Sequence, residues 1–209
     1  MLEGKTRGKI SYKGCKILVR QNNITGITST NTHSPYAIEE PVGAIVNPAN
    51  SELKNKGGAA YEIEDAGGKD VQQACIDYIQ KNTQLKVGHA MHTPAGDLPC
   101  KYVIHVVGPK CEEGQQDLSK ESKQLKKAVK NVLAKMLELD IGSISMLAIS
   151  TGIFNFPLEK CVKIYGKQIK KFIDGHEQKM KKKEIILWNF DRKTTNAMLK
   201  GNSTQIYTD

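Results

Sequence analysis

The stretch VGAIVNPANSELKNKGGAA, residues 42–60, decides the fold of this chain. Its first five residues are apolar or small, the pattern of a short strand buried on both faces. The polar turn Asn47-Pro48-Ala49-Asn50 follows, then a glycine pair at 57–58, and a helix is expected to begin near Ala59. A strand that leads through glycines into a helix start is typical of α/β proteins that bind anions.

The same alternation of strand and helix continues along the rest of the chain. Strands are predicted at residues 16–20, 42–46, 101–107, 144–149 and 184–189, and helices from 59, over 69–80 and 119–139, from about 157, and over 194–199. Residues 1–9 are expected to form a basic, flexible arm, and residues 24–41 a polar loop. We therefore predict one α/β domain over residues 10–209, with three α/β/α layers and a mixed, largely parallel central sheet.

Length, charge and composition narrow the function classes. With 209 residues the chain is long enough for one well-packed domain, and its net charge of +9 favours anionic partners or simply solubility. Aromatic residues are only 6% of the chain and do not interleave with the basic runs, so a nucleic-acid platform is unsupported. No apolar run approaches the ~20 residues of a membrane span, and we expect a monomer that does not enter membranes.

The five cysteines are scattered and include no C-x-x-C pair. This spacing disfavours both a disulfide framework and a zinc site. We therefore expect an intracellular protein, cytoplasmic or nuclear or both, with no metal and no cofactor.

Three loops that follow predicted strands are candidates for ligand binding, because ligands of such sheets sit beyond the carboxyl ends of the strands. They are residues 47–60, residues 150–154 and residues 188–193. Glycines ahead of a helix let a backbone approach an anion, although such turns are also common as simple connectors. A G-x-x-x-x-G-K-[ST] motif is absent from the sequence, which excludes a P-loop.

Several motifs, in order, resemble those of the macro domain family. Residues 47–51 with Gly57-Gly58 are similar to N-A-A-N-S…G-G-G, residues 103–109 to V-I-H-x-V-G-P, and residues 149–157 to I-S-T-G-I-[FY]-G-[FY]-P, with Asn155 in place of a glycine. Asn22-Asn23-Ile24-Thr25 looks like G-D-I-T, and Phe190-Asp191 sits where members carry an aromatic–Asp pair. The resemblance spans residues 10–200 and implies the macro fold, with ADP-ribose as ligand and ADP-ribosylated proteins as partners.

The resemblance also implies a role for each matched residue. Adenine is expected to stack on Phe190 beside Asn23 and Ile24. Asn23 stands where the family carries an Asp, and its hydrogen bond to the adenine amino group is expected to be weaker because charge-assisted bonds are stronger. The distal ribose is expected to lie under Phe154, and Asn50 is expected to hydrogen-bond its hydroxyls. Asn47 either contacts the ligand or holds the shape of the loop. His105 is expected to be structural. The diphosphate is expected between two sets of backbone amides, those of Gly57, Gly58, Ala59 and Ala60 and those of Ser150, Thr151, Gly152, Ile153 and Phe154.

Two functions follow from the resemblance. The best-known hydrolytic macro domains carry an Asp at the position of Ala60, so the sequence favours a reader of mono-ADP-ribosylated proteins or of terminal ADP-ribose. The alternative is an ADP-ribosyl hydrolase in which Asn50 is the key catalytic residue. Binding of related ligands, adenine nucleotides or RNA, is a third reading. The resemblance leaves open whether this chain is excised from a larger protein, as many macro domains are.

Overall fold

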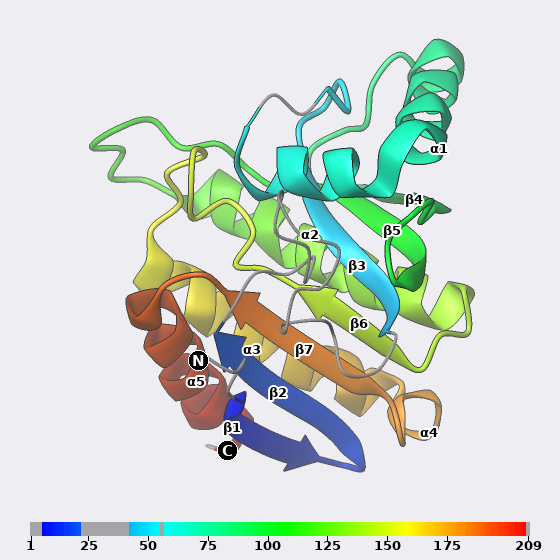
Figure 1. Ribbon diagram of the computed structural model, residues 1–209. Coiled ribbons are helices and arrows are strands. Elements are labelled where there is room, and N and C mark those ends of the chain that lie inside the picture. The colour runs from blue at the N-terminus through cyan, green and yellow to red at the C-terminus, as the bar shows by residue number, and fades with distance from the viewer. Residues whose placement is uncertain (1–5, 22–41, 55–56, 208–209) are drawn as a thin grey trace.

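The fold is a seven-stranded sheet with helices on both faces, as the computed structural model describes it for residues 6–21, 42–54 and 57–207 (Figure 1). The strands are β1 (Thr6–Tyr12), β2 (Cys15–Gln21), β3 (Val42–Ala49), β4 (Ala90–Pro94), β5 (Cys100–Val107), β6 (Ser143–Met146) and β7 (Glu184–Asn189). The helices are α1 (Gly58–Asn82), α2 (Ser119–Glu138), α3 (Leu158–Gly175), α4 (Glu177–Met180) and α5 (Arg192–Tyr207).

The sheet is parallel in its middle and antiparallel at its two edges. Its order is β1-β2-β7-β6-β3-β5-β4, and β2, β7, β6, β3 and β5 pair in parallel along it. The edge strands β1 and β4 run antiparallel to β2 and β5. The predicted mixed, largely parallel sheet is therefore confirmed.

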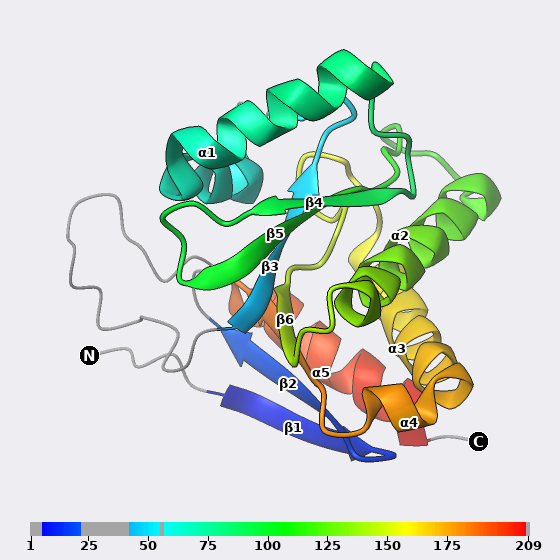
Figure 2. The same cartoon turned by 90° about the vertical axis from the view of Figure 1, so that its right-hand side faces the viewer.

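The helices complete the outer two layers (Figure 2). On one face, the buried residues Ile63 and Val71 of α1 pack in one cluster with Ile45 and Val103 of the sheet. On the other face, α2, α3 and α5 bury apolar residues against a second and larger cluster. Their positions confirm the predicted three-layer α/β/α arrangement. No helix in the described part of the chain is long and apolar enough to cross a membrane.

Some boundaries differ from the sequence-based expectation. Residues 6–9, expected in the flexible arm, belong to β1 and pair with β2. The helices expected from 59 and over 69–80 are one element, α1, with a break where Gly68 adopts φ 70°. Gly68 lies in the left-handed region that glycine tolerates, so the chain bends there without a loop.

Strand β4 was not predicted, and β6 is shorter than expected. β4 is a five-residue edge strand that ends in Pro94, and so carries a weak strand signal. β6 stops at Met146 rather than Ile149, because beyond it a tyrosine hydroxyl replaces the next strand as hydrogen-bond partner. The predicted loop over residues 24–41 lies outside the described residues.

Candidate functional site

The strands β7, β6 and β3 are neighbours in the sheet, and their carboxyl ends meet at one edge (Figure 1). The loops that follow them, the β3 loop (residues 50–57), the β6 loop (residues 147–157) and the short turn at Phe190 and Asp191, carry most of the predicted site residues. The topology thus brings together three segments that are far apart in the chain.

The β6 loop is held by hydrogen bonds from within the protein. The hydroxyl of Tyr165, on α3 and fully buried, donates to the carbonyl of Leu147 at 2.7 Å and accepts from the amide of Ile149 at 2.9 Å. The loop then closes on itself, since the amide of Phe156 donates to the carbonyl of Ser150 at 2.9 Å. Ser150 adopts φ 69°, a left-handed conformation uncommon for a serine.

Three consecutive amides of the β6 loop, those of Gly152, Ile153 and Phe154, have no backbone partner in the part of the chain that the structure describes. The Ile153 side chain is 73% exposed, and a Cβ placed on Gly152 would meet nothing within 4 Å. Successive amides in a turn of this kind form a concavity suited to an anion.

The β3 loop is held by its own side chain. The Asn50 Oδ1 accepts from the amides of Glu52 and Lys54, both at 3.1 Å, and its Nδ2 donates to the carbonyl of Lys54 at 2.6 Å. An amide nitrogen carries two hydrogens. Within the part of the chain that the structure describes, one N–H of Asn50 therefore has no acceptor, while the oxygen is already occupied.

The glycines at the start of α1 lie opposite the β6 loop. A Cβ placed on Gly58, at φ 64°, would come 3.7 Å from Cδ1 of Ile153. Gly57 is exposed and a Cβ there would meet no atom within 4 Å, so it borders open space. Ala59 is half-buried and Ala60 is buried, and the first turn of α1 holds no acidic residue. Gly58 and Ile153, one from each predicted amide set, are therefore neighbours.

The end of β7 exposes one aromatic ring and buries another. Phe190 is 48% exposed, whereas Trp188, two residues earlier, is 2% exposed and packs in the core. Asp191 caps the following helix, since its Oδ1 accepts from the amide of Thr194 at 2.7 Å. Burial raises the pKa of the Asp191 carboxyl, but hydrogen bonds, those from Thr194 foremost, outweigh it and hold the pKa below its usual value. This cap fixes Phe190 between strand and helix.

Asn47 belongs to a buried polar row beneath the site. It has no exposed surface, and its Nδ2 donates to Nδ1 of His105 at 3.1 Å. The His105 Nε2 therefore carries the proton and donates to Oγ1 of Thr93 at 3.1 Å. Burial, with a smaller effect of His92, lowers the pKa of His105 to about 3, so the ring is neutral. The arrangement favours the shape-holding role for Asn47 and agrees with a structural role for His105.

Some predicted residues stand apart from this geometry. Asn23 and Ile24 lie outside the described residues, so their adenine contact stays a prediction.

Within the described ranges, no group of three or more His, Cys, Asp or Glu side chains is placed to hold a metal ion. The sequence analysis did not predict that Asp191 caps a helix, although an Asp three residues before Thr194 is a recognisable signal for a helix start.

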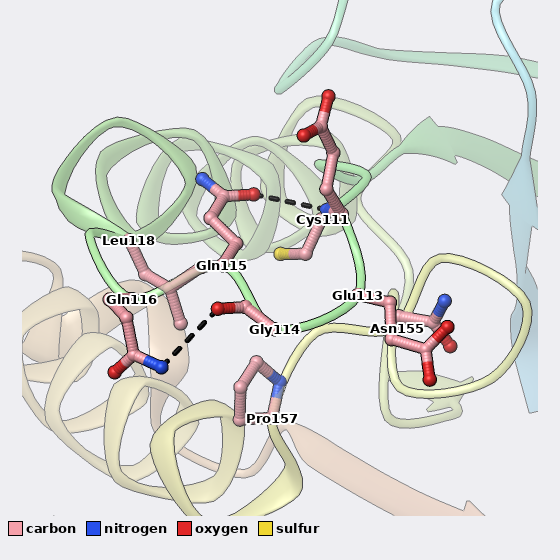
Figure 3. A pocket seen from close by; sticks show the side chains of 9 residues that line it. Cys111, Glu113, Gly114, Gln115, Gln116, Leu118, Asn155 and Pro157 are labelled. Atoms are coloured by element: carbon pink, nitrogen blue, oxygen red, sulfur yellow. Dashed lines mark hydrogen bonds between the residues drawn. The ribbon is translucent and has the colours of Figure 1, made fainter.

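A pocket lies between the β6 loop and the segment that precedes α2 (Figure 3). It has a volume of about 460 Å³. Its lining residues are Cys111, Glu112, Glu113, Gly114, Gln115, Gln116, Leu118, Asn155 and Pro157. No sequence motif pointed to this pocket.

Comparison with known proteins identifies the family. The Macro domain family matches residues 46–165. An uncharacterized protein of Thermotoga maritima is 41% identical over 191 residues, which cover 91% of this chain but only 29% of that protein. The O-acetyl-ADP-ribose deacetylase of Shigella flexneri is 36% identical over 135 residues, covering 65% of this chain and 75% of that protein. This chain therefore belongs to the macro domain family.

The fold agrees with solved members of that family. The Oceanobacillus iheyensis macrodomain with ADP superposes with a TM-score of 0.78 at 21% sequence identity, covering 95% of this chain and 96% of that one. At this level of identity the likeness concerns the fold.

Proposed function

We propose that this domain binds ADP-ribose and recognises mono-ADP-ribosylated proteins or terminal ADP-ribose. The observation that carries the proposal is the approach of Gly58, at the start of α1, to Ile153 of the β6 loop, where the amides of Gly152, Ile153 and Phe154 have no backbone partner among the described residues. A diphosphate is an anion that such amides and the positive end of α1 stabilise. Because the binding groups are backbone amides, the diphosphate needs no particular side chain.

The flanking residues suit the two ends of such a ligand. Phe190 offers an exposed ring at the end of β7 on which a flat base can stack. The N–H of Asn50 that has no acceptor among the described residues would donate to a ribose hydroxyl, and Phe154, half-buried in the β6 loop, would cover that ribose. ADP in a solved macrodomain and the deacetylase name of the Shigella relative support the same ligand class.

Binding without turnover is the mode that the local chemistry favours. Ala60 offers no acid or base at the position where hydrolytic macro domains carry an Asp, and the Oδ1 of Asn50 is already occupied by two amides. The name of the Shigella relative favours a second candidate, hydrolysis of an ADP-ribose derivative with the remaining N–H of Asn50 as its key group.

Titration calorimetry with free ADP-ribose tests the binding proposal. We expect Phe190→Ala to weaken binding at least about fivefold, since stacking of a base on an aromatic ring is worth about 1–3 kcal/mol. Ile76→Ala removes a comparably exposed apolar side chain from the far part of α1 and should leave affinity unchanged. Equal affinity of the wild-type protein and Phe190→Ala would contradict the stacking role.

A release assay separates the two modes. The protein, at catalytic and at equimolar amounts, is incubated with a protein ADP-ribosylated on glutamate, and free ADP-ribose is followed over time. Retention of the labelled protein without release supports the reader. Release at catalytic amounts that Asn50→Ala abolishes supports the hydrolase, and neither retention nor release contradicts both.

A further inference from the structure

The pocket beside the β6 loop has an ordered wall. The amide of Glu112 donates to Oε1 of Gln115 at 3.0 Å, and the amide of Gln115 donates back to the carbonyl of Glu112 at 3.2 Å. The side-chain nitrogen of Gln115 also donates to the carbonyl of Asp117 at 2.9 Å (Figure 3 shows the first of these bonds). Hydrogen bonds within residues 112–117 therefore hold this wall of the pocket.

The pocket is lined by acidic and amide side chains, although the protein as a whole is basic. Glu112 and Glu113 contribute two carboxylates, no Lys, Arg or His lines the pocket, and the whole chain carries +9. Within the described ranges, neither carboxylate forms an ion pair. Leu118 and Pro157 add apolar surface at the same hollow. Carboxylates above apolar surface suit a long basic side chain, which buries its aliphatic stem and pairs its charged end.

The pocket adjoins the part of the β6 loop that carries Phe154. The amide of Cys111, in the pocket wall, donates to the carbonyl of Phe154 at 2.9 Å. Asn155, the next residue, adopts φ 53° and lines the pocket where the resemblance would place a glycine. A polypeptide attached to the distal ribose would therefore leave the ligand site next to this hollow.

We infer that this pocket receives a Lys or Arg side chain of the modified protein, close in sequence to the ADP-ribosylated residue. The inference rests on the proposed function and names the class of partner for that site: a basic segment carrying a single ADP-ribose. A further ADP-ribose unit would instead bring phosphate charges towards Glu112 and Glu113, and like charges repel. The pocket thus favours single ADP-ribose on protein over a chain of ADP-ribose units.

The test compares peptides that carry one ADP-ribose through a hydrolysis-resistant amide nitrogen. One peptide has a Lys two residues from the modification, and the other has norleucine there. We expect the Lys peptide to bind about fivefold more tightly at low salt, the scale of exposed ion pairs, and the difference to shrink as salt rises. Glu112→Gln/Glu113→Gln should abolish the difference and leave the affinity for free ADP-ribose unchanged.

A charge-matched variant controls for the overall field of the protein. Glu138→Gln/Asp140→Asn removes the same charge near the amino end of β6, and the Lys peptide should keep its full advantage there. Equal binding of the two peptides to the wild-type protein, with free ADP-ribose bound normally, would overturn this inference alone. So would an advantage that survives in Glu112→Gln/Glu113→Gln. No binding of free ADP-ribose would overturn the proposed function and this inference with it.

Discussion

The β3 and β6 loops both follow buried parallel strands and both lead into helices, yet they are stabilised differently. The β6 loop depends on Tyr165, a fully buried side chain from α3 that occupies the backbone groups beyond the end of β6. The β3 loop depends on Asn50, a side chain of the loop itself, which is half-buried. The polar anchor of the β6 loop therefore comes from a distant core side chain, whereas that of the β3 loop is its own, although Leu53 is buried in the core and the Ser51 carbonyl accepts from the amide of Leu85 at 2.8 Å. Similar glycine patterns do not imply similar rigidity.

The largest expected effect comes from removing the polar anchor of the β6 loop. Tyr165→Phe leaves the buried carbonyl of Leu147 and amide of Ile149 without a partner, at about 1–3 kcal/mol for each such group. We expect urea unfolding to show a loss of about 2–3 kcal/mol in the free energy of unfolding, together with weaker ADP-ribose binding. Tyr102→Phe, at a half-buried ring that packs edge-on to His92, is the matched control. An unchanged free energy of unfolding in Tyr165→Phe would refute this anchoring role.

An intermediate effect is expected at the polar anchor of the β3 loop. Asn50→Ala removes three side-chain bonds to the loop backbone, which water can partly replace because the loop is exposed. We expect the free energy of unfolding to fall by less than about 1 kcal/mol. Hydrogen exchange at the amides of Glu52 and Lys54 should become markedly faster. Asn50→Asp keeps the acceptor oxygen and should preserve their protection; fast exchange there too would mean that another group holds the loop.

The smallest effect is expected at Asn155. A left-handed conformation costs most L-residues about 1–2 kcal/mol, but asparagine tolerates it and glycine has no such penalty. Asn155→Gly should therefore change the free energy of unfolding by no more than about 0.5 kcal/mol, and Asn155→Ala should lower it by about 1 kcal/mol. Thermal melts of the two variants compare them directly. A loss in Asn155→Gly as large as that in Asn155→Ala would mean that the amide side chain itself stabilises the β6 loop.

Much of the fold could be predicted because its determinants are local. The apolar runs at 42–46, 101–107 and 184–189 lie within β3, β5 and β7, and the stripe of apolar residues over 119–139 matches α2. The glycine pair at 57–58 marks the start of α1. The meeting of the two glycine loops followed from the parallel order of the strands.

The rest depends on contacts between distant parts of the chain. Tyr165 forms hydrogen bonds with residues 16 and 18 positions away in the chain. Nothing in the sequence indicates whether its hydroxyl faces the core or solvent. Thr93 became a partner of His105 only through the pairing of β4 with β5. The acidic pocket is formed by two segments that precede different helices, so no single stretch of the sequence predicts it.

The buried row of Thr93, His105 and Asn47 makes the folded domain sensitive to acid. His105 takes up a proton in the unfolded chain near pH 6.5, whereas in the folded domain its pKa is about 3. Below pH 6.5 the unfolded state therefore binds more protons than the native state, and stability falls as the pH drops towards 3. Above pH 6.5 the ring is neutral in both states and contributes no pH dependence. Because Asn47 is the residue that His105 holds, the proton that unfolds this row also loosens the end of β3 from which the β3 loop departs.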